Sequence, residues 1–155
     1  MSELKPIRIM LVEDDPGDQK LIRQSILRQR LANDVCVMES AEEALEYLQG
    51  VKAGEADHYA PELILLDLNM PGMGGKEFLR HVKEDERFAT VPVVILTTSD
   101  SDQDILDSYK LHASGYVKKP VELQAFQEVM ATLEDYWFMI CRRAVSYTHL
   151  TLPTN

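Results

Sequence analysis

The sequence predicts an α/β fold, a doubly wound parallel sheet of five strands with helices on both faces. Strand-like apolar runs alternate five times with segments of helical periodicity along the 155 residues. Three of these runs are almost continuously apolar, which is typical of parallel strands buried on both faces. Alternating strands and helices joined by short connections give a parallel sheet with right-handed crossovers.

The predicted strands are apolar runs that end in polar or turn-like stretches. They cover residues 7–12, about 34–38, 62–67, 91–97 and 115–118. The third run ends at Asp67, directly before a turn-like stretch at 68–75 that is rich in glycine.

Capping residues and apolar spacing mark the helices between the strands. Asp15-Pro16 is typical of an N-cap followed by proline at the first helical position, and Ser40 with Glu43 forms a capping box. Further helices are predicted around Phe78, Leu79 and Val82, after a cap at Ser101, and over the long periodic run from Phe126 to Ile140.

Composition limits the class of protein. The chain is 45% hydrophobic and 27% charged, as an ordinary soluble domain is, and no apolar run approaches the roughly 18 residues that span a bilayer. The short polar N-terminus does not resemble a secretory signal. Cys36 and Cys141 are too few for a disulfide framework or a metal cluster, so we expect plain thiols in a cytoplasmic protein.

The net charge of -10 argues against direct nucleic-acid binding, which needs a basic face. Solvated helix faces are the simpler interpretation of the acidic excess. In the other interpretation, part of it forms a cation site and part forms an acidic surface for a partner. That surface would comprise Asp100, Asp102, Asp104 and Asp107.

We expect one domain over residues 1–141, in which the polar stretch from Gln49 to Pro61 is a surface loop. From about Arg142 onward the helical periodicity stops. Residues 142–155 resemble the translation of a sequencing adapter or cloning scar, so we expect them to contribute to neither the fold nor the function. On that interpretation the natural C-terminus is missing.

Reactive side chains stand at the ends of four predicted strands, where open α/β sheets bind their ligands. Glu13 and Asp14 follow the first strand, Asp67 ends the third, Thr97 the fourth, and Lys119 follows the fifth. Any one of them alone is more often a helix cap or a surface group. Together, three carboxylates, a hydroxyl and an ammonium are the set that a magnesium and phosphoryl site needs.

The residue types suggest a division of roles. A carboxylate can attack phosphorus to give an acyl phosphate, and Asp67 is the expected acceptor because the following turn exposes it to a donor. Glu13 and Asp14 are adjacent and better suited to hold Mg²⁺, and the longer Glu13 is expected to reach the ion through water. Lys119 would neutralise the phosphoryl oxygens, and Thr97 would donate its hydroxyl to one of them.

Four short motifs in this order resemble the signatures of response-regulator receiver domains. They are VEDD at 12–15, LDLNMPG at 66–72, LTT at 96–98 and YVKKP at 116–120, and the resemblance runs from Ile7 to Trp137. It implies a flavodoxin-like receiver fold with sheet order 2-1-3-4-5 and phosphorylation of Asp67 by a histidine kinase with Mg²⁺. It also implies that the backbone carbonyl of Asn69 is a metal ligand.

The same resemblance implies that phosphorylation switches the conformation of the domain and that nearby side chains control the lifetime of the phosphoryl group. In the family, Thr97 moves toward the phosphoryl group, Tyr116 turns inward, and the surface of the fourth helix, fifth strand and fifth helix changes. Tyr116 could equally be a half-buried strand aromatic without a switching role. Asn69 and Ser99 are small enough to leave a water path, so we expect the domain to catalyse its own dephosphorylation as well as its phosphorylation.

A narrower resemblance points to small receivers partnered with phytochrome-type histidine kinases. It is carried by the polar loop before the third strand, the run at 96–99 and the aromatic stretch at 136–138. The last helix, through Trp137, Phe138 and Ile140, then either supports a homodimer or packs on its own domain. The downstream protein target is not specified by the sequence.

Three alternatives stay open at this point. A pseudo-receiver would have the fold without phosphorylation. A transcription factor would have lost a DNA-binding domain where the unusual tail begins. A flavodoxin-like cofactor binder would need a phosphate-binding loop where this chain has Glu13, Asp14 and Asp15, whose charges repel a phosphate unless a metal intervenes.

Overall fold

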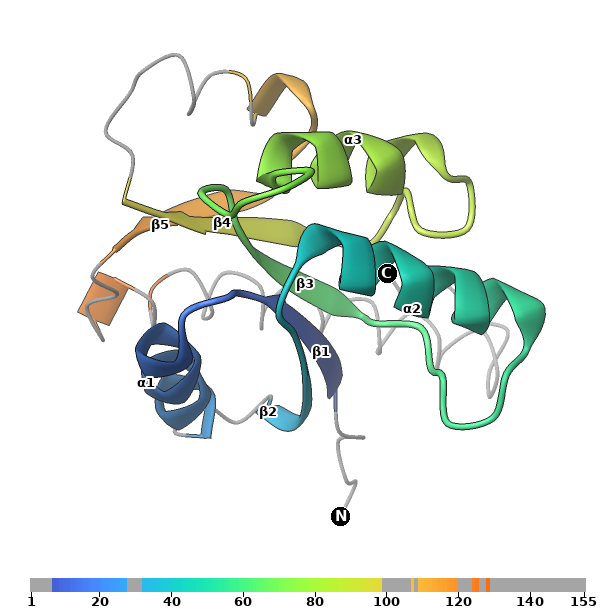
Figure 1. Cartoon of the computed structure of the whole chain (residues 1–155). Coiled ribbons are helices and arrows are strands. Elements are labelled where there is room, and N and C mark those ends of the chain that lie inside the picture. The colour runs from blue at the N-terminus through green and yellow to red at the C-terminus, as the bar shows by residue number, and fades with distance from the viewer. Residues whose placement is uncertain are drawn as a thin grey trace, which may run out of the picture.

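The computed structural model describes residues 7–27, 32–98, 107, 109–119, 124–125 and 128. Its centre is a parallel sheet with the strand order β2-β1-β3-β4-β5, which confirms the predicted fold class and order (Figure 1). The strands are β1 (Ile7–Val12), β2 (Ala32–Met38), β3 (Leu63–Asp67), β4 (Val93–Thr97) and β5 (Gly115–Lys118). Their bounds differ from the predicted ones by no more than two residues.

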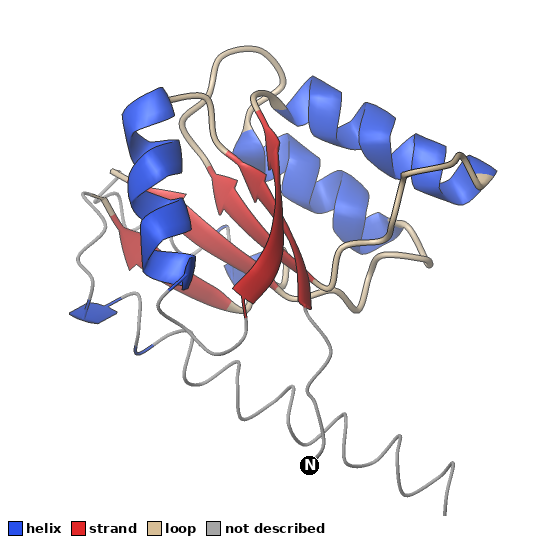
Figure 2. Ribbon diagram, turned by 90° about the horizontal axis from the view of Figure 1, so that it is seen from below, coloured by secondary structure: helices blue, strands red, loops and turns tan. Residues whose placement is uncertain are grey.

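Helices cover both faces of this sheet, as a doubly wound fold requires (Figure 2). α1 (Pro16–Leu27) lies on one face, and α2 (Ala41–Ala53) and α3 (Gly75–Glu84) lie on the other. Alternate side chains of a strand point to opposite faces. In β1, Ile9 and Leu11 therefore pack with α1, while Met10 and Val12 pack with α2 and α3.

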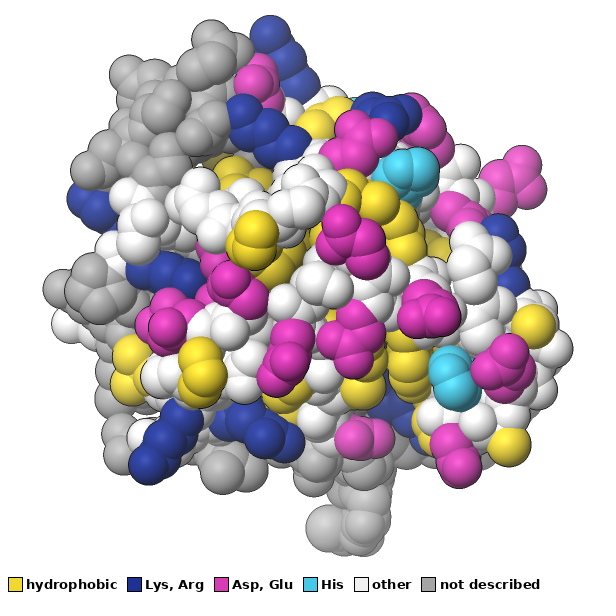
Figure 3. All heavy atoms as spheres, in the orientation of Figure 1, with side chains coloured by type: hydrophobic (Ala, Val, Ile, Leu, Met, Phe, Trp, Pro, Cys, Tyr) yellow, Lys and Arg dark blue, Asp and Glu magenta, His cyan; other side chains and the backbone are white. Residues whose placement is uncertain are grey.

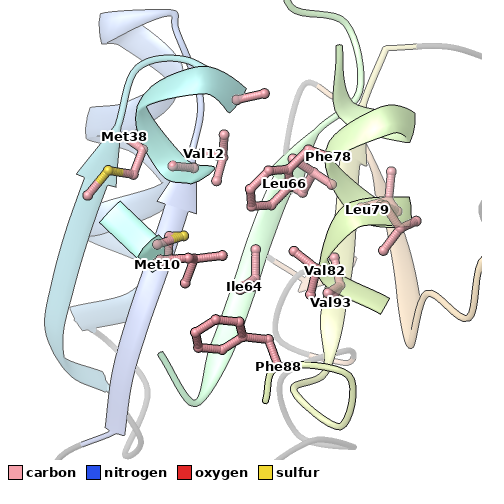
Figure 4. Close-up of a cluster of buried hydrophobic side chains, with 14 of the residues drawn as sticks. Met10, Val12, Met38, Ile64, Leu66, Phe78, Leu79, Val82, Phe88 and Val93 are labelled. Carbon is pink, nitrogen blue, oxygen red and sulfur yellow. The ribbon is translucent and has the colours of Figure 1, made fainter. Parts of the chain in front are cut away.

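The larger core lies between the sheet and the pair α2 and α3 (Figure 4). Phe78 of α3 and Phe88 of the following loop are fully buried there against Ile64 and Leu66 of β3. Burying a side chain of this size contributes about 1.5–3 kcal/mol. The two cores hold the strands rigidly, and with them the strand ends.

The helix caps follow the predicted pattern. The backbone N–H of Asp18 donates to Asp15 Oδ2 (2.8 Å) at the start of α1, and that of Glu43 donates to Ser40 Oγ (3.0 Å) at the start of α2. The returning bond of the capping box goes one residue further back, because the backbone N–H of Glu39 donates to Glu43 Oε1 (2.7 Å).

The predicted loop from Gln49 to Pro61 is wrong at its beginning, because α2 continues to Ala53. Gly50 and Val51 are buried in this last turn, so packing outweighs the weak helix propensity of glycine. The helix ends at Gly54, whose left-handed backbone (φ 76°) caps the final carbonyls.

Several predictions lie outside the described residues. These are most of the helix capped by Ser101, the last helix with Trp137, Phe138 and Ile140, Ser99, and the tail at 142–155. Within the described ranges, no helix is both long and apolar enough to cross a membrane. Acidic side chains are spread over the face that carries α2 and α3 (Figure 3), and α2 itself exposes Glu42, Glu43 and Glu46.

Candidate functional site

The carboxyl ends of the parallel strands bring the predicted site residues to one edge of the sheet. Glu13 follows β1, Asp67 ends β3, Thr97 ends β4 and Lys119 follows β5, and all four are buried. Burying a charge is costly unless it is paired. Contacts among these four buried polar groups must therefore offset the cost of burying them.

Three carboxylates form an acidic cluster at this edge. One oxygen each from Glu13, Asp14 and Asp67 lies within 4.8 Å of the other two. Asp14 is exposed while the other two are buried, so the cluster opens to solvent on the side of Asp14. Hard carboxylate oxygens at this spacing suit Mg²⁺, which binds one or two carboxylates and keeps several waters.

The buried Glu13 fits a cation site. Its Oε1 lies 2.6 Å from Lys119 Nζ as an ion pair, but within the described part of the chain it makes no hydrogen bond of good geometry. Burial raises the pKa of Glu13 to about 7, and the Lys119 ammonium opposes this rise only in part. A divalent cation beside it would favour the charged form.

The Lys119 ammonium stands among three carboxylates. Its Nζ lies 2.6 Å from Glu13 Oε1, 2.9 Å from Asp18 Oδ2 and 3.3 Å from Asp67 Oδ2. Burial lowers the pKa of Lys119, but the close contacts with the Glu13 and Asp18 carboxylates and the charge of Asp67 outweigh this effect and raise it above its ordinary value. Lys119 is therefore a fixed positive charge beside the Asp67 carboxylate.

Asn69 connects the end of β3 to the end of β4. Its backbone N–H donates to Asp67 Oδ1 (3.0 Å), and its side-chain Nδ2 donates to the hydroxyls of Thr97 and, at 3.3 Å, Thr98. The family resemblance implied that the backbone carbonyl of Asn69 is a metal ligand, and the small Asn69 side chain was expected to leave a path for water. Neither expectation indicated this side-chain bridge between two strand ends.

The loop after Asp67 is held by α2. Glu42 Oε2 accepts a hydrogen bond from the backbone N–H of Met73 (2.9 Å) and lies against Gly72, whose φ is 82°. Gly75 packs so closely that a Cβ there would come within 2.6 Å of the Asp67 carbonyl oxygen. The loop after Asp67 is thus held by α2 at Met73 and packs tightly against the Asp67 backbone at Gly75.

The structure brings together most of the predicted site residues. Glu13, Asp67 and Lys119 are in contact, with Asp14 in the acidic cluster, and Thr97 joins through Asn69. Tyr116 is half-buried and packs against the core shared by α2 and α3. Asp18, which contacts Lys119, is a residue at this site that the sequence did not indicate.

A flavodoxin-like domain with an acidic cluster and a buried lysine at the carboxyl edge of its sheet has the architecture of a phosphoryl-accepting signalling domain. The response regulator receiver domain pattern matches residues 9–131, and the chain belongs to this family. It is therefore the receiver domain of a two-component response regulator, a class that is phosphorylated on aspartate.

Known relatives agree with this assignment. The chain is 32% identical over 133 residues to response regulator Rcp1 of Synechocystis, covering 85% of this chain and 89% of Rcp1. It is similar to the crystal structure of the phosphorylated cyanobacterial phytochrome response regulator RcpA, with a TM-score of 0.72, 36% identity, and 86% and 95% of the two chains covered. The Mn²⁺-bound form of Rcp1 gives a TM-score of 0.70 at 32% identity, with 85% and 94% covered.

Proposed function

We propose that Asp67 is the phosphoryl acceptor of this receiver. The observation that carries the proposal is the position of its carboxylate, in the cluster with Glu13 and Asp14 and 3.3 Å from the Lys119 ammonium. An Asp67 oxygen forms a bond to phosphorus while the bond from phosphorus to the donor's leaving group breaks. The product is an acyl phosphate, and the leaving group departs with its electron pair.

The acidic cluster is the proposed Mg²⁺ site, with ligands from Glu13, Asp14, Asp67 and the backbone carbonyl of Asn69. Support comes from the spacing of the carboxylates and from the Mn²⁺-bound form of the similar protein Rcp1. A bound divalent cation would neutralise charge on the phosphoryl oxygens. Glu13 is proposed to act on the ion through a water molecule.

The remaining site residues have roles that follow from charge and hydrogen bonding. Lys119 neutralises the charge on one phosphoryl oxygen. The Thr97 hydroxyl gives up its hydrogen bond with Asn69 and donates a hydrogen bond to another phosphoryl oxygen. Tyr116 is the proposed partner of Thr97 in the switch. Asn69 and Ser99 control the access of water to the acyl phosphate, which sets its lifetime.

A histidine kinase is the proposed phosphoryl donor, and a phytochrome-type kinase is the specific candidate. The similarity to RcpA, a phytochrome response regulator, supports this choice. The phosphorylated domain would then signal by binding a downstream protein.

A homodimer through the last helix stays a prediction, as does a single domain over 1–141 followed by a non-native tail. A cytoplasmic location suits the free thiol of Cys36.

Intact mass measurement after incubation with acetyl phosphate tests the acceptor. We expect one phosphoryl adduct that requires Mg²⁺ and is absent from Asp67→Asn. Asp57→Asn is the matched control, because it removes the same charge at a left-handed position (φ 66°) that asparagine adopts easily. A folded wild type that binds Mg²⁺ and gains no adduct would favour the pseudo-receiver instead.

A further inference from the structure

The first turn of α1 supplies a carboxylate that reaches the buried lysine of the site. Asp18 Oδ2 lies 2.9 Å from Lys119 Nζ, across 101 positions of sequence. We propose that Asp18 is a positioning residue for phosphoryl transfer, which holds the Lys119 ammonium in place while the other carboxylates around it bind metal and phosphoryl group. This inference rests on the proposed function and specifies how that site works.

The contacts of Lys119 divide into two kinds. Glu13 and Asp67 belong to the acidic cluster, so a metal ion or a phosphoryl group would engage the same two carboxylates that now face the ammonium. Among the carboxylates described around Lys119, Asp18 alone lies outside that cluster. It is therefore the partner that the ammonium keeps throughout the reaction.

The sheet explains why these groups meet on the side of α1. Leu11, Leu65 and Val117 point toward α1 and pack with its apolar side chains. Because side chains alternate along a strand, positions two residues further on continue toward the same face. Those positions are Glu13, Asp67 and Lys119.

The backbone that carries Asp18 is itself fastened to the site. Its N–H donates to Asp15 Oδ2 (2.8 Å), and the backbone N–H of Asp15 donates to Glu13 Oε2 (3.1 Å). The neighbouring Gln19 donates its Nε2–H to the Glu13 carbonyl (2.7 Å). A carboxylate in the first turn of a helix is also favoured by the helix dipole. Asp18 is thus a rigid anchor.

Lysine needs such an anchor because its ammonium ends a flexible four-carbon stem. Lys119 is only 7% exposed, while the Asp18 side chain is 30% exposed and lies on the solvent side of the pair. If Asp18 were neutral, the ammonium would be drawn fully toward the cluster carboxylates. It would then be displaced when those carboxylates bind the metal and the phosphoryl group.

A variant series tests the anchor by the rate of adduct formation from acetyl phosphate at saturating Mg²⁺. We expect Asp18→Asn to lower the maximal rate about 10-fold, within the range that misplacing a reacting group costs. The donor concentration at half-maximal rate and the Mg²⁺ affinity by calorimetry should stay unchanged. Asp18→Glu, which keeps the carboxylate, should recover most of the rate. Glu39→Gln removes one negative charge from an exposed residue after β2 and should behave as wild type.

The Lys119 ammonium can also be observed directly by NMR. Its N–H protons should exchange slowly enough to be seen in the wild type and in Asp18→Glu, and should be lost in Asp18→Asn. Lys119→Arg assigns the signal by its absence. An Asp18→Asn protein that reacts at the wild-type rate and keeps the signal would overturn the anchor while leaving the proposed function intact. A wild type that forms no adduct would overturn the proposed function itself.

Discussion

At the scale of single residues, the site is a group of buried charges that stabilise one another. Lys119 is held by three carboxylates, and two of these also belong to the acidic cluster. Breaking a buried ion pair generally costs more than the pair contributes to stability, because one charge is left without a partner. The arrangement is therefore explained by function rather than by its contribution to the folded state.

Cys36 allows a test of the local electrostatics at the edge strand β2. Burial raises the pKa of this half-buried thiol, and the charges of Asp34 and Glu43 raise it further. A raised pKa keeps the thiol protonated to higher pH, and the thiolate is the form that reacts. With Cys141→Ser as background, we expect alkylation by iodoacetamide to reach its plateau at higher pH in the folded protein than in urea.

Asp34→Asn provides the control for this measurement. It removes one of the two nearby charges and should move the folded profile toward lower pH, while the profile in urea hardly changes. Identical profiles for the folded and the unfolded protein would contradict the described surroundings of Cys36.

At the scale of elements, the junction between β3 and α3 packs against the backbone of Asp67, the proposed acceptor. Gly74 has a backbone conformation (φ 85°, ψ 159°) that is essentially restricted to glycine. Gly75 has no such constraint, but a Cβ there would lie 2.6 Å from the Asp67 carbonyl oxygen and 2.7 Å from Leu68 Cα. The two glycines are thus required for different physical reasons.

Alanine substitutions separate these reasons. Gly74→Ala should lower the free energy of unfolding by about 1–3 kcal/mol through backbone strain, since a Cβ there meets no atom within 4 Å. Gly75→Ala should cost about 1–3 kcal/mol by overpacking, and it should also slow the phosphorylation of Asp67. Chemical denaturation and adduct formation measure the two effects. Equal phosphorylation rates in both variants would contradict the close approach of Gly75.

Most helices and strands could be predicted from the sequence. The strands, their order and the helix caps were predictable, because apolar runs, capping residues and the family motifs are local signals. The end of α2 was not, because Gly50 argues against helix and only the burial of Val51 in the core keeps that turn helical.

Some contacts between residues distant in sequence could also be predicted, and others could not. That Glu13, Asp67 and Lys119 would meet could be expected from the rule that parallel strands present their carboxyl ends at one edge. The contact of Asp18 with Lys119 depends on where α1 lies on the sheet, and the bridge from Asn69 to Thr97 depends on side-chain orientation. Neither the position of α1 nor the orientation of the Asn69 side chain can be predicted from local sequence.

At the scale of the whole molecule, binding at the sheet edge should be coupled to folding. The acidic cluster joins the two residues that follow β1 to the last residue of β3 and exists only when the sheet is formed. A ligand that binds only the folded state stabilises it by mass action. Mg²⁺ at about 100 times its dissociation constant should therefore add about 2.7 kcal/mol to the free energy of unfolding.

Thermal unfolding in Mg²⁺ and in EDTA measures this coupling. For a chain of this length the expected rise in Tm is about 5–10 °C. Asp14→Asn should lose most of the rise, because Asp14 is the exposed carboxylate of the cluster. An equal rise in the wild type and in Asp14→Asn would place the stabilising ion elsewhere.

In the proposed function, Asp67 itself carries the phosphoryl group. Borohydride reduces an aspartyl phosphate to homoserine with loss of phosphate, so the acceptor can be located by sequencing peptides after reduction of the adduct. We predict homoserine at position 67, dependent on Mg²⁺ and on acetyl phosphate. A reduced side chain at Glu13 or Asp14 with Asp67 unchanged, or no reduced residue in a protein that carries the adduct, would contradict the account.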